Sequence, residues 1–330
     1  MMATSKDAST RKSQWCIVIG DDHAPDRLIT GASDLDPAPV QYSCLGGSAT
    51  LLHMALHRAA AIAPPSQILV TALQEYRNRW EPTLWFVRPE MRFVRKKGTS
   101  PLLTSAAAIL SIATVSASSI VTILPARCYV GHEWILRQAL RQAVSGLRQI
   151  PEGAATLGMM DIDAGVDEDY LVVNRTRPWR GGLTALGIAR RPTAWVARHL
   201  RRQGALVSSG ILIGYAGVLA AHISKHWPGI SEELMTGIAA AGAAPREFEI
   251  SDDLQRVPSS SLRSLRWHPP AFPQQVFAVY DSGWSGLKSP YAVDRIADFW
   301  ANRADRSPPS LMSSTTPNQD SNSLPFESQV

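Results

Sequence analysis

The sequence of 330 residues contains few cysteines, and its three lie far apart as Cys16, Cys44 and Cys128. They form no CxxC pair and no Cys/His spacing typical of a zinc site. We therefore expect neither a disulfide framework nor a zinc centre, and a reducing cytoplasm is the default location.

A large excess of one charge is also missing, because 33 basic residues stand against 28 acidic ones and the formal net charge is +5. The basic residues form short clusters at 95–97, 190–191 and 201–202, without interleaved aromatic side chains. Proteins that bind single-stranded nucleic acid combine basic grooves with stacking aromatics. No nucleic-acid partner is therefore expected, and a solvated basic surface is the simpler interpretation.

Long hydrophobic runs are scarce as well. Residues 106–124 contain several Ser and Thr and precede a proline, and residues 205–221 contain internal glycines. A membrane-spanning helix needs about 20 predominantly apolar residues. We expect no membrane partner and no signal peptide, since residues 1–14 are polar.

What the sequence does contain is 45% hydrophobic residues, the composition of a globular protein with a substantial core. Residues 1–14 form a polar leader, and residues 301–330 are rich in Ser, Pro and Asn, so both ends are predicted to be disordered. The remainder, residues 15–300, is expected to form one domain.

Short apolar runs typical of strands alternate along this domain with segments that have the apolar spacing of helices. This order predicts a mainly parallel sheet flanked by helices. A helix is expected to begin near Ser48, a typical capping residue. Residues 245–275 read as an irregular, proline-rich stretch. Strands are predicted at 15–20, 67–72, 84–88, 119–124, 155–160, 170–174, 205–214 and 276–280, a further segment at 183–189, and helices at 48–62, 74–80, 101–115, 132–148, 193–203 and 215–226.

The stretch WCIVIGDDHAPDRL, residues 15–28, begins like the first strand of a nucleotide-binding domain. Its apolar run leads into Gly20, where many α/β proteins place a glycine-rich loop whose backbone N–H groups bind phosphate. Asp21 and Asp22 follow instead. The turn could be an altered phosphate loop, a metal site or a plain strand-to-loop corner.

Later stretches support the first alternative. In chain order they read APVQYSCLGGSATLLHMALHRA, ILVTALQEYRNRW, VTILPARCYVGHEWILRQALRQA, LGMMDIDAGVDEDYLVV, RRPTAWVARHLRRQGALVSSGILIGYAGVL and YDSGWSGLKSPYAV. Together with the opening strand, this series resembles the mannose-1-phosphate guanylyltransferase (GDP-mannose pyrophosphorylase) family of sugar-phosphate nucleotidyltransferases. The resemblance extends over residues 15–295, and it is the order of the blocks that carries it.

The resemblance implies an α/β, Rossmann-like nucleotidyltransferase fold with a mainly parallel, mixed central sheet flanked by helices. Family members join a sugar 1-phosphate to a nucleoside triphosphate and release pyrophosphate, using Mg²⁺ held by carboxylates. Substrates of such folds bind above the carboxyl edge of the sheet. An active member would thus form a nucleotide sugar such as GDP-mannose and require Mg²⁺.

Several positions depart from the family pattern. In the loop, Asp21 and Asp22 replace glycines, and Pro25 removes an N–H donor, so two carboxylates are expected to face the triphosphate. The family's lysine is replaced by Val40, and its two metal-binding aspartates are replaced by Arg127 and Gly286.

Other positions retain the family's residue type. The resemblance implies four candidates for nucleotide binding, which are Gly20, Arg27, Gly98 and Thr99. It implies four candidates for sugar-phosphate binding, which are Tyr170, Arg191, Ser209 and Gly210. It leaves no confident catalytic residue and no metal ligand. The two histidines His53 and His57 are spaced for a metal, but they lack the HExxH form and read as surface residues.

Three functions remain open at this point. The chain could be a divergent, non-catalytic relative that binds a nucleotide or sugar phosphate, or that regulates an active paralogue by pairing with it. It could be an active nucleotidyltransferase that forms a nucleotide sugar. In either case its protein partner could be a second copy of the chain, as a homo-oligomer, or a paralogue. It could also be a structural protein on the same fold. Arg127 and Lys288 would allow a metal-free anion site.

Overall fold

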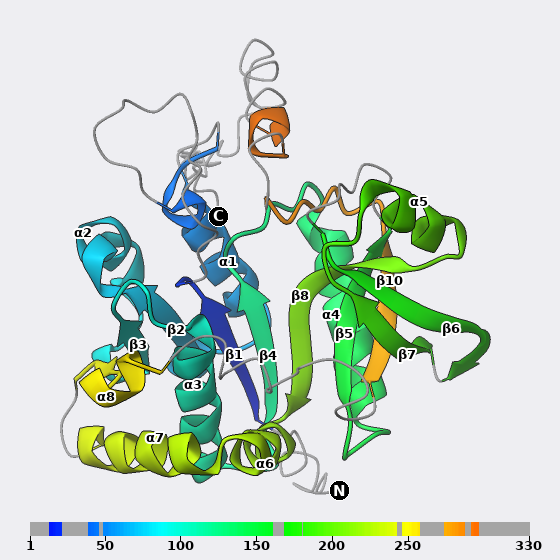
Figure 1. Ribbon diagram of the computed structural model, residues 1–330. Coiled ribbons are helices and arrows are strands. Elements are labelled where there is room, and N and C mark those ends of the chain that lie inside the picture. The colour runs from blue at the N-terminus through cyan, green and yellow to red at the C-terminus, as the bar shows by residue number, and fades with distance from the viewer. Residues whose placement is uncertain are drawn as a thin grey trace, which may run out of the picture.

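The computed structural model describes residues 13–21, 39–45, 49–160, 168–179, 181–242, 246–257, 274–287 and 292–296. Within these ranges, ten strands form one mixed sheet in the order β5-β10-β7-β6-β8-β4-β1-β2-β3-β9, and β5 also pairs with β8 (Figure 1). The predicted tail at 301–330 and most of the predicted leader at 1–14 lie outside the described residues.

The strands are β1 (Gln14–Ile19), β2 (Ile68–Leu73), β3 (Arg92–Arg95), β4 (Ile120–Pro125), β5 (Ala154–Met160), β6 (Tyr170–Trp179), β7 (Gly182–Ala189), β8 (Leu206–Tyr215), β9 (Phe248–Glu249) and β10 (Gln274–Tyr280). The helices are α1 (Leu51–Ala60), α2 (Arg77–Trp80), α3 (Pro101–Val115), α4 (Glu133–Leu147), α5 (Ala194–Arg202), α6 (Ala216–His226), α7 (Pro228–Ala241) and α8 (Asp252–Gln255). Short 3₁₀ helices cover Val40–Tyr42, Pro65–Gln67, Gln74–Tyr76, Glu81–Leu84 and Pro89–Met91.

Strand directions bring most strand ends to one edge of the sheet. Strands β1 to β4 are mutually parallel, β8 runs antiparallel to β4 and β5, and β10 is parallel to β5. The carboxyl ends of β1, β2, β3, β4, β5 and β10 therefore share one edge with the start of β8. We call this the carboxyl edge, and it is where ligands bind in open α/β sheets.

The central strand β1 is buried on both faces, as parallel strands between helical layers are. Alternate residues of β1 pack into two different apolar clusters, one on each face of the sheet. Cys16 and Val18 pack with α1 and α4 on one face. Trp15, Ile17 and Ile19 pack on the other face with α3, α6 and α7, which lie together in Figure 1. The period of two along β1 thus separates two apolar layers.

The predicted fold class is confirmed, but some elements differ. The strand predicted at 84–88 is wrong: Glu81–Leu84 is a 3₁₀ helix, and the third parallel strand is β3, Arg92–Arg95. The apolar run at 84–88 is short and continuous, and such a run does not distinguish a buried strand from a helical segment. Helix α1 begins after Thr50, whose Oγ1 accepts a hydrogen bond from the His53 N–H, rather than near Ser48. Helix α7 was not predicted.

No helix in the described ranges is both long and apolar enough to cross a membrane.

Candidate functional site

The turn after β1 is anchored on the neighbouring strand. The Gly20 N–H donates to the Thr71 carbonyl of β2 at 3.0 Å. A Cβ at this position would lie 2.6 Å from that carbonyl oxygen, so the close approach requires glycine. The Gly20 carbonyl accepts hydrogen bonds from Gln41 Nε2 at 3.0 Å and from the Tyr42 hydroxyl at 2.7 Å. Both backbone groups of Gly20 are therefore used inside the protein.

Burial keeps the Tyr42 hydroxyl in its neutral, donating form. Removal from water raises the pKa of Tyr42 above its ordinary range, and the nearby negative charge of Asp21 acts in the same direction. The residue is 5% exposed. The 3₁₀ helix that begins at Val40 is thereby fixed against the end of β1.

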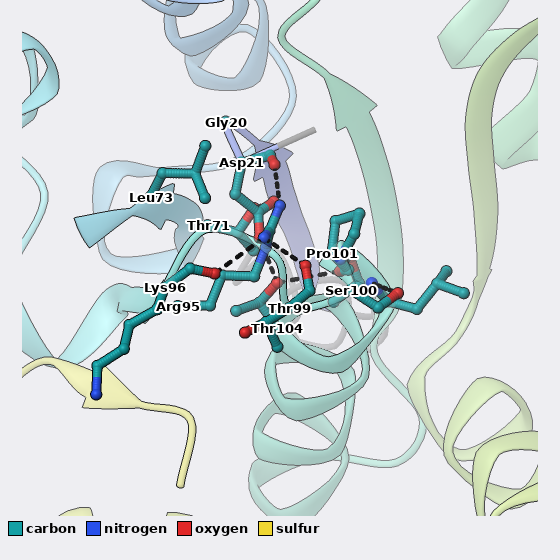
Figure 2. Close-up of polar contacts among 12 residues, drawn as sticks. Gly20, Asp21, Thr71, Leu73, Arg95, Lys96, Thr99, Ser100, Pro101 and Thr104 are labelled. Carbon is teal, nitrogen blue, oxygen red and sulfur yellow. Dashed lines mark hydrogen bonds and ion pairs between the residues drawn. The ribbon is translucent and has the colours of Figure 1, made fainter. Parts of the chain in front are cut away.

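Asp21 points into the protein and is completely buried. Its Oδ2 accepts hydrogen bonds from Arg95 Nε and Thr104 Oγ1, each at 2.6 Å, and its Oδ1 accepts one from Thr71 Oγ1 (Figure 2). Arg95 also donates through Nη2 to the Asp21 carbonyl. This differs from the expected orientation, in which Asp21 faces a triphosphate. The ion pair with Arg95 and two hydroxyl donors account for the inward position, because a buried charge needs such partners.

Arg95 extends the same network to the segment before α3. It is 1% exposed, and its Nη1 donates to the carbonyls of Thr99 at 2.5 Å and Lys96 at 3.3 Å. The turn between them contains Gly98 at a φ of +92°, a conformation that favours glycine. Helix α3 follows, capped by Ser100 Oγ, which accepts from the Leu102 N–H (Figure 2).

The structure thus brings together three of the four nucleotide-binding candidates. Gly20 and Thr99 are linked through the Asp21–Arg95 pair, and Gly98 lies in the adjoining turn. Arg27 lies outside the described residues, as do Asp22 and Pro25. Nucleotide binding by these residues stays a prediction.

The segments carrying Arg127 and Gly286 run side by side at the carboxyl edge. Tyr129 and Ser285 form an antiparallel bridge in which each N–H donates to the other's carbonyl at 2.9 Å. The resemblance places the family's two metal-binding aspartates on these segments. Arg127 is half-buried there, and Lys288 lies outside the described residues.

The space beside Gly286 is filled by a carboxylate that the sequence did not single out. A Cβ on Gly286 would lie 2.6 Å from Glu168 Oε1 and 2.9 Å from the Trp284 ring. Glu168 is only 8% exposed. An aspartate at position 286 would therefore require the Glu168 carboxylate and the Trp284 ring to shift.

These residues do not fit a magnesium ion. Mg²⁺ prefers an octahedron of oxygen ligands, whereas the two positions supply a guanidinium and a glycine, with one carboxylate beside them. Within the described ranges, no group of three or more His, Cys, Asp or Glu side chains could hold a metal.

The sugar-phosphate candidates lie at the same edge, near the start of β8. Tyr170 is completely buried and pairs with Ala189 of β7 and Val207 of β8. Ser209 is buried, and its Oγ donates to the Leu157 carbonyl at 2.7 Å.

The other two candidates have unusual backbones. Gly210 has a φ of +74°, and a Cβ there would lie 3.0 Å from Pro125 Cγ. Arg191 is exposed, has a φ of +38°, and donates its N–H to Asp169 Oδ1 at 3.1 Å. A role in sugar-phosphate binding stays a prediction for all four.

Two further family positions have structural roles. Arg58, which closes α1, is 2% exposed and forms a bidentate pair with Glu133 at the start of α4, with N···O distances of 2.6 and 3.0 Å. Val40 packs beside a small apolar cluster that includes Leu45 and Tyr129. Neither side chain adds a cation to the carboxyl edge.

Sequence reasoning missed Arg95 and Glu168. Arg95 belongs to the basic cluster at 95–97, which was interpreted as solvated surface, and no local pattern in the sequence marks it as the partner of Asp21. No sequence signal pairs Glu168 with Gly286, because the two meet through β6 and the segment after β10.

No model of a known protein family matches the sequence, and no curated protein matches it significantly. Solved structures do resemble the fold. Mannose-1-phosphate geranyltransferase from Thermus thermophilus has a TM-score of 0.66 at 19% identity, over 86% of this chain and 79% of that one. Mannose-6-phosphate isomerase from Helicobacter pylori has a TM-score of 0.59 at 14% identity, over 83% and 99%.

A protein described as a glucose-1-phosphate thymidylyltransferase, from Bacillus anthracis, has a TM-score of 0.52 at 12% identity, over 87% of this chain and 95% of that one. At such identities the likeness concerns the fold alone. The chain has a sugar-phosphate nucleotidyltransferase-like fold.

Proposed function

We propose that this protein is a divergent relative of the mannose-1-phosphate guanylyltransferases that binds a nucleotide or a sugar phosphate and carries out little or no magnesium-dependent transfer. One observation carries the proposal. Arg127 and Gly286 occupy the positions where the resemblance predicts metal-binding aspartates, and Glu168 fills the space beside Gly286.

The chemistry of transfer explains why these changes matter. Joining a sugar phosphate to a nucleoside triphosphate concentrates negative charge, and catalysis depends on cations positioned where that charge develops. A carboxylate pair attracts Mg²⁺, whereas a guanidinium repels it. With Arg127 in place, the metal-dependent route loses its principal cation.

The turn after β1 supports the same conclusion. A phosphate loop presents free backbone N–H groups to its ligand, but the Gly20 N–H is bonded to Thr71. Asp21 adds a negative charge that Arg95 neutralises internally. Any anionic ligand must therefore find its cations elsewhere, and Arg127 and Arg191 are the candidates among the family positions.

The catalytic half of the proposal is tested by incubating the full chain with mannose 1-phosphate, GTP and Mg²⁺ while following pyrophosphate release. We expect no release above the protein-free control. Turnover at ordinary enzyme rates, on the order of 1–10³ s⁻¹, would overturn this half.

The binding half is tested by thermal unfolding with GTP, GDP-mannose or mannose 1-phosphate. A ligand at 100 times its Kd stabilises the folded state by about 2.7 kcal/mol. We expect at least one of these ligands to stabilise the chain, less so after Arg127→Gln. The matched control is Arg141→Gln, which removes the same charge from the exposed face of α4. No stabilisation by any ligand would contradict binding and favour a purely structural role.

A further inference from the structure

An apolar cavity of about 410 Å³ lies at the edge of the sheet opposite the carboxyl edge. Three of its lining residues, Trp15, Leu69 and Phe93, are each the second residue of a parallel strand, in β1, β2 and β3. We call this edge the amino edge. The other walls come mainly from α3 and α7, which pack against each other (Figure 1). None of the positions that the resemblance singles out is among the described residues that line the cavity.

The deepest part of the cavity is aromatic. Trp15, Phe93 and Phe248 are 8%, 2% and 6% exposed, so they lie well inside the protein. The ring centroids of Phe93 and Phe248 are 5.2 Å apart, a separation typical of packed aromatic pairs. Met91 and Met235 are half-buried and pack against the same apolar cluster. A ligand that enters this cavity therefore meets aromatic rings and flexible thioether side chains.

Small residues on the two helices leave the space beside these rings open. Helix α7 contributes Ala239, Ala241 and Gly242 to the wall, and α3 contributes Ser111. Protein interiors are otherwise packed as densely as organic crystals, with few voids larger than a water molecule. Apolar cavities tend to stay dry and to take up apolar molecules. The volume lies at the lower end of the range for small-molecule sites.

The rim of the cavity indicates that its ligand is uncharged. Val115, Thr114 and Arg246 are exposed there, and the half-buried Glu90 pairs with Arg88 at 3.1 Å. Among the described lining residues, the ionisable ones are thus one acid and one base, and both lie at the rim. Burying a charged group without a partner is costly. An ion placed against the aromatic walls would carry that cost, whereas an uncharged ring would not.

We propose that this cavity binds a small uncharged aromatic molecule, of about the size of two fused rings, against Trp15, Phe93 and Phe248. Aromatic rings contact one another in offset or edge-to-face arrangements, and methionine side chains adapt to the shape of such a ligand. The proposal does not rest on the function proposed above, because it concerns the other edge of the sheet and other residues.

The experiment titrates 2-naphthol into the full chain, labelled with ¹³C in the methionine methyl groups, and follows the NMR signals. Single Met→Leu variants assign those signals. The ring current of the ligand should shift the Met91 and Met235 signals saturably. The signals of Met54 on α1 and Met160 at the carboxyl edge should stay in place, since neither residue lines the cavity.

Two further probes test the chemical class. Phenol has the same hydroxyl group but one ring, so it buries less apolar surface and should bind at least about tenfold more weakly than 2-naphthol. The anion 2-naphthoate has the same two rings as 2-naphthol but carries a charge. It should also bind at least about tenfold more weakly, because its carboxylate must lose water on entry.

A filled cavity should lose the ligand. In Ala241→Trp the indole ring replaces a small wall residue, so the affinity for 2-naphthol should fall at least about tenfold. The matched control is Ala240→Trp, at the neighbouring exposed position of the same helix, which is not among the lining residues. Its affinity should stay within about twofold of the unmodified chain. Circular dichroism checks that both variants are folded, and the methionine signals of the unmodified chain test the site without either variant.

Equal losses in the two tryptophan variants would overturn the site, and so would shifts of Met54 or Met160 as large as those of Met91 and Met235. The absence of saturable binding at millimolar 2-naphthol would have the same meaning. Binding of 2-naphthoate as tight as that of 2-naphthol would overturn the uncharged class. Because no probe contains a phosphate or a sugar, failure here leaves the nucleotide proposal standing, and the reverse also holds.

Discussion

Arg95 and Asp21 form a buried ion pair between the ends of β3 and β1, with Nε 2.6 Å from Oδ2 and no solvent exposure of either side chain. Because Arg95 also holds the carbonyls of Asp21 and Thr99, this pair fixes the turn after β1 to the segment that enters α3. The Asp21 carboxylate, which was expected to face a triphosphate, is thus a structural element of the carboxyl edge.

Asp21→Asn is expected to destabilise the folded state strongly. The amide can still accept hydrogen bonds, but it leaves the buried guanidinium of Arg95 without a counter-charge, and breaking such a pair typically costs about 3–5 kcal/mol. Urea unfolding monitored by circular dichroism measures the change. The control is Asp252→Asn, which removes an exposed carboxylate paired with Lys96 and should leave the unfolding midpoint unchanged. A similar midpoint for both variants would contradict a structural role for the Asp21–Arg95 pair.

Gly286→Ala should be destabilising because of Glu168. The new methyl group would lie 2.6 Å from Glu168 Oε1, and relieving such overpacking costs about 1–3 kcal/mol. Adding Glu168→Ala removes the shorter contact and leaves the one of 2.9 Å to the Trp284 ring. The double variant should therefore lose less stability than the sum of the two single changes. Gly187→Ala is the control, because a Cβ there meets no atom within 4 Å. Strict additivity of the two changes would refute the collision.

The elements that the sequence predicted well are those with strong local signals. β1 is apolar from Trp15 to Ile19 because these residues are buried on both faces of the sheet, and α4 has a clear apolar stripe through Leu136 and Leu140. The third parallel strand was misplaced because β3 has only four residues and two of them are arginines. Its arginine at position 95 is buried only because Asp21 lies opposite, a pairing that no local pattern reveals.

The candidate site was predictable only in outline. Parallel strands place their ends at one edge, so Gly20, Arg127 and Gly286 were expected to lie along it, and the strand directions agree.

The direction in which a side chain points depends on partners far away in the sequence. Asp21 was expected to face a ligand, yet Thr71, Arg95 and Thr104 hold it inside. The partner of Gly286 could not be predicted for the same reason.

The three thiols should differ sharply in reactivity. Cys16 lies in β1 between β2 and β4 with no exposure, and Cys128 is 2% exposed, whereas Cys44 is exposed. The thiolate is the reactive form, and burial raises the pKa of both the Cys16 and the Cys128 thiol. Iodoacetamide should therefore label only Cys44 in the folded chain and all three in urea, as read by peptide mass spectrometry. Labelling of Cys16 at the rate of Cys44 would contradict the structure of β1.

The same burial makes stability depend on alkaline pH. In the unfolded chain a thiol loses its proton near its ordinary pKa of about 8.5, while the raised pKa of Cys16 keeps the folded form protonated. Proton release then favours unfolding, so the contribution of Cys16 is fully present below about pH 8.5 and declines as the pH rises further. Urea unfolding across this range should show a shallower decline for Cys16→Ala than for the unmodified chain. Cys44→Ala serves as the control and should keep the original slope, since its thiol is exposed in both states. Parallel slopes for all three proteins would show that the Cys16 thiol is not shielded from water.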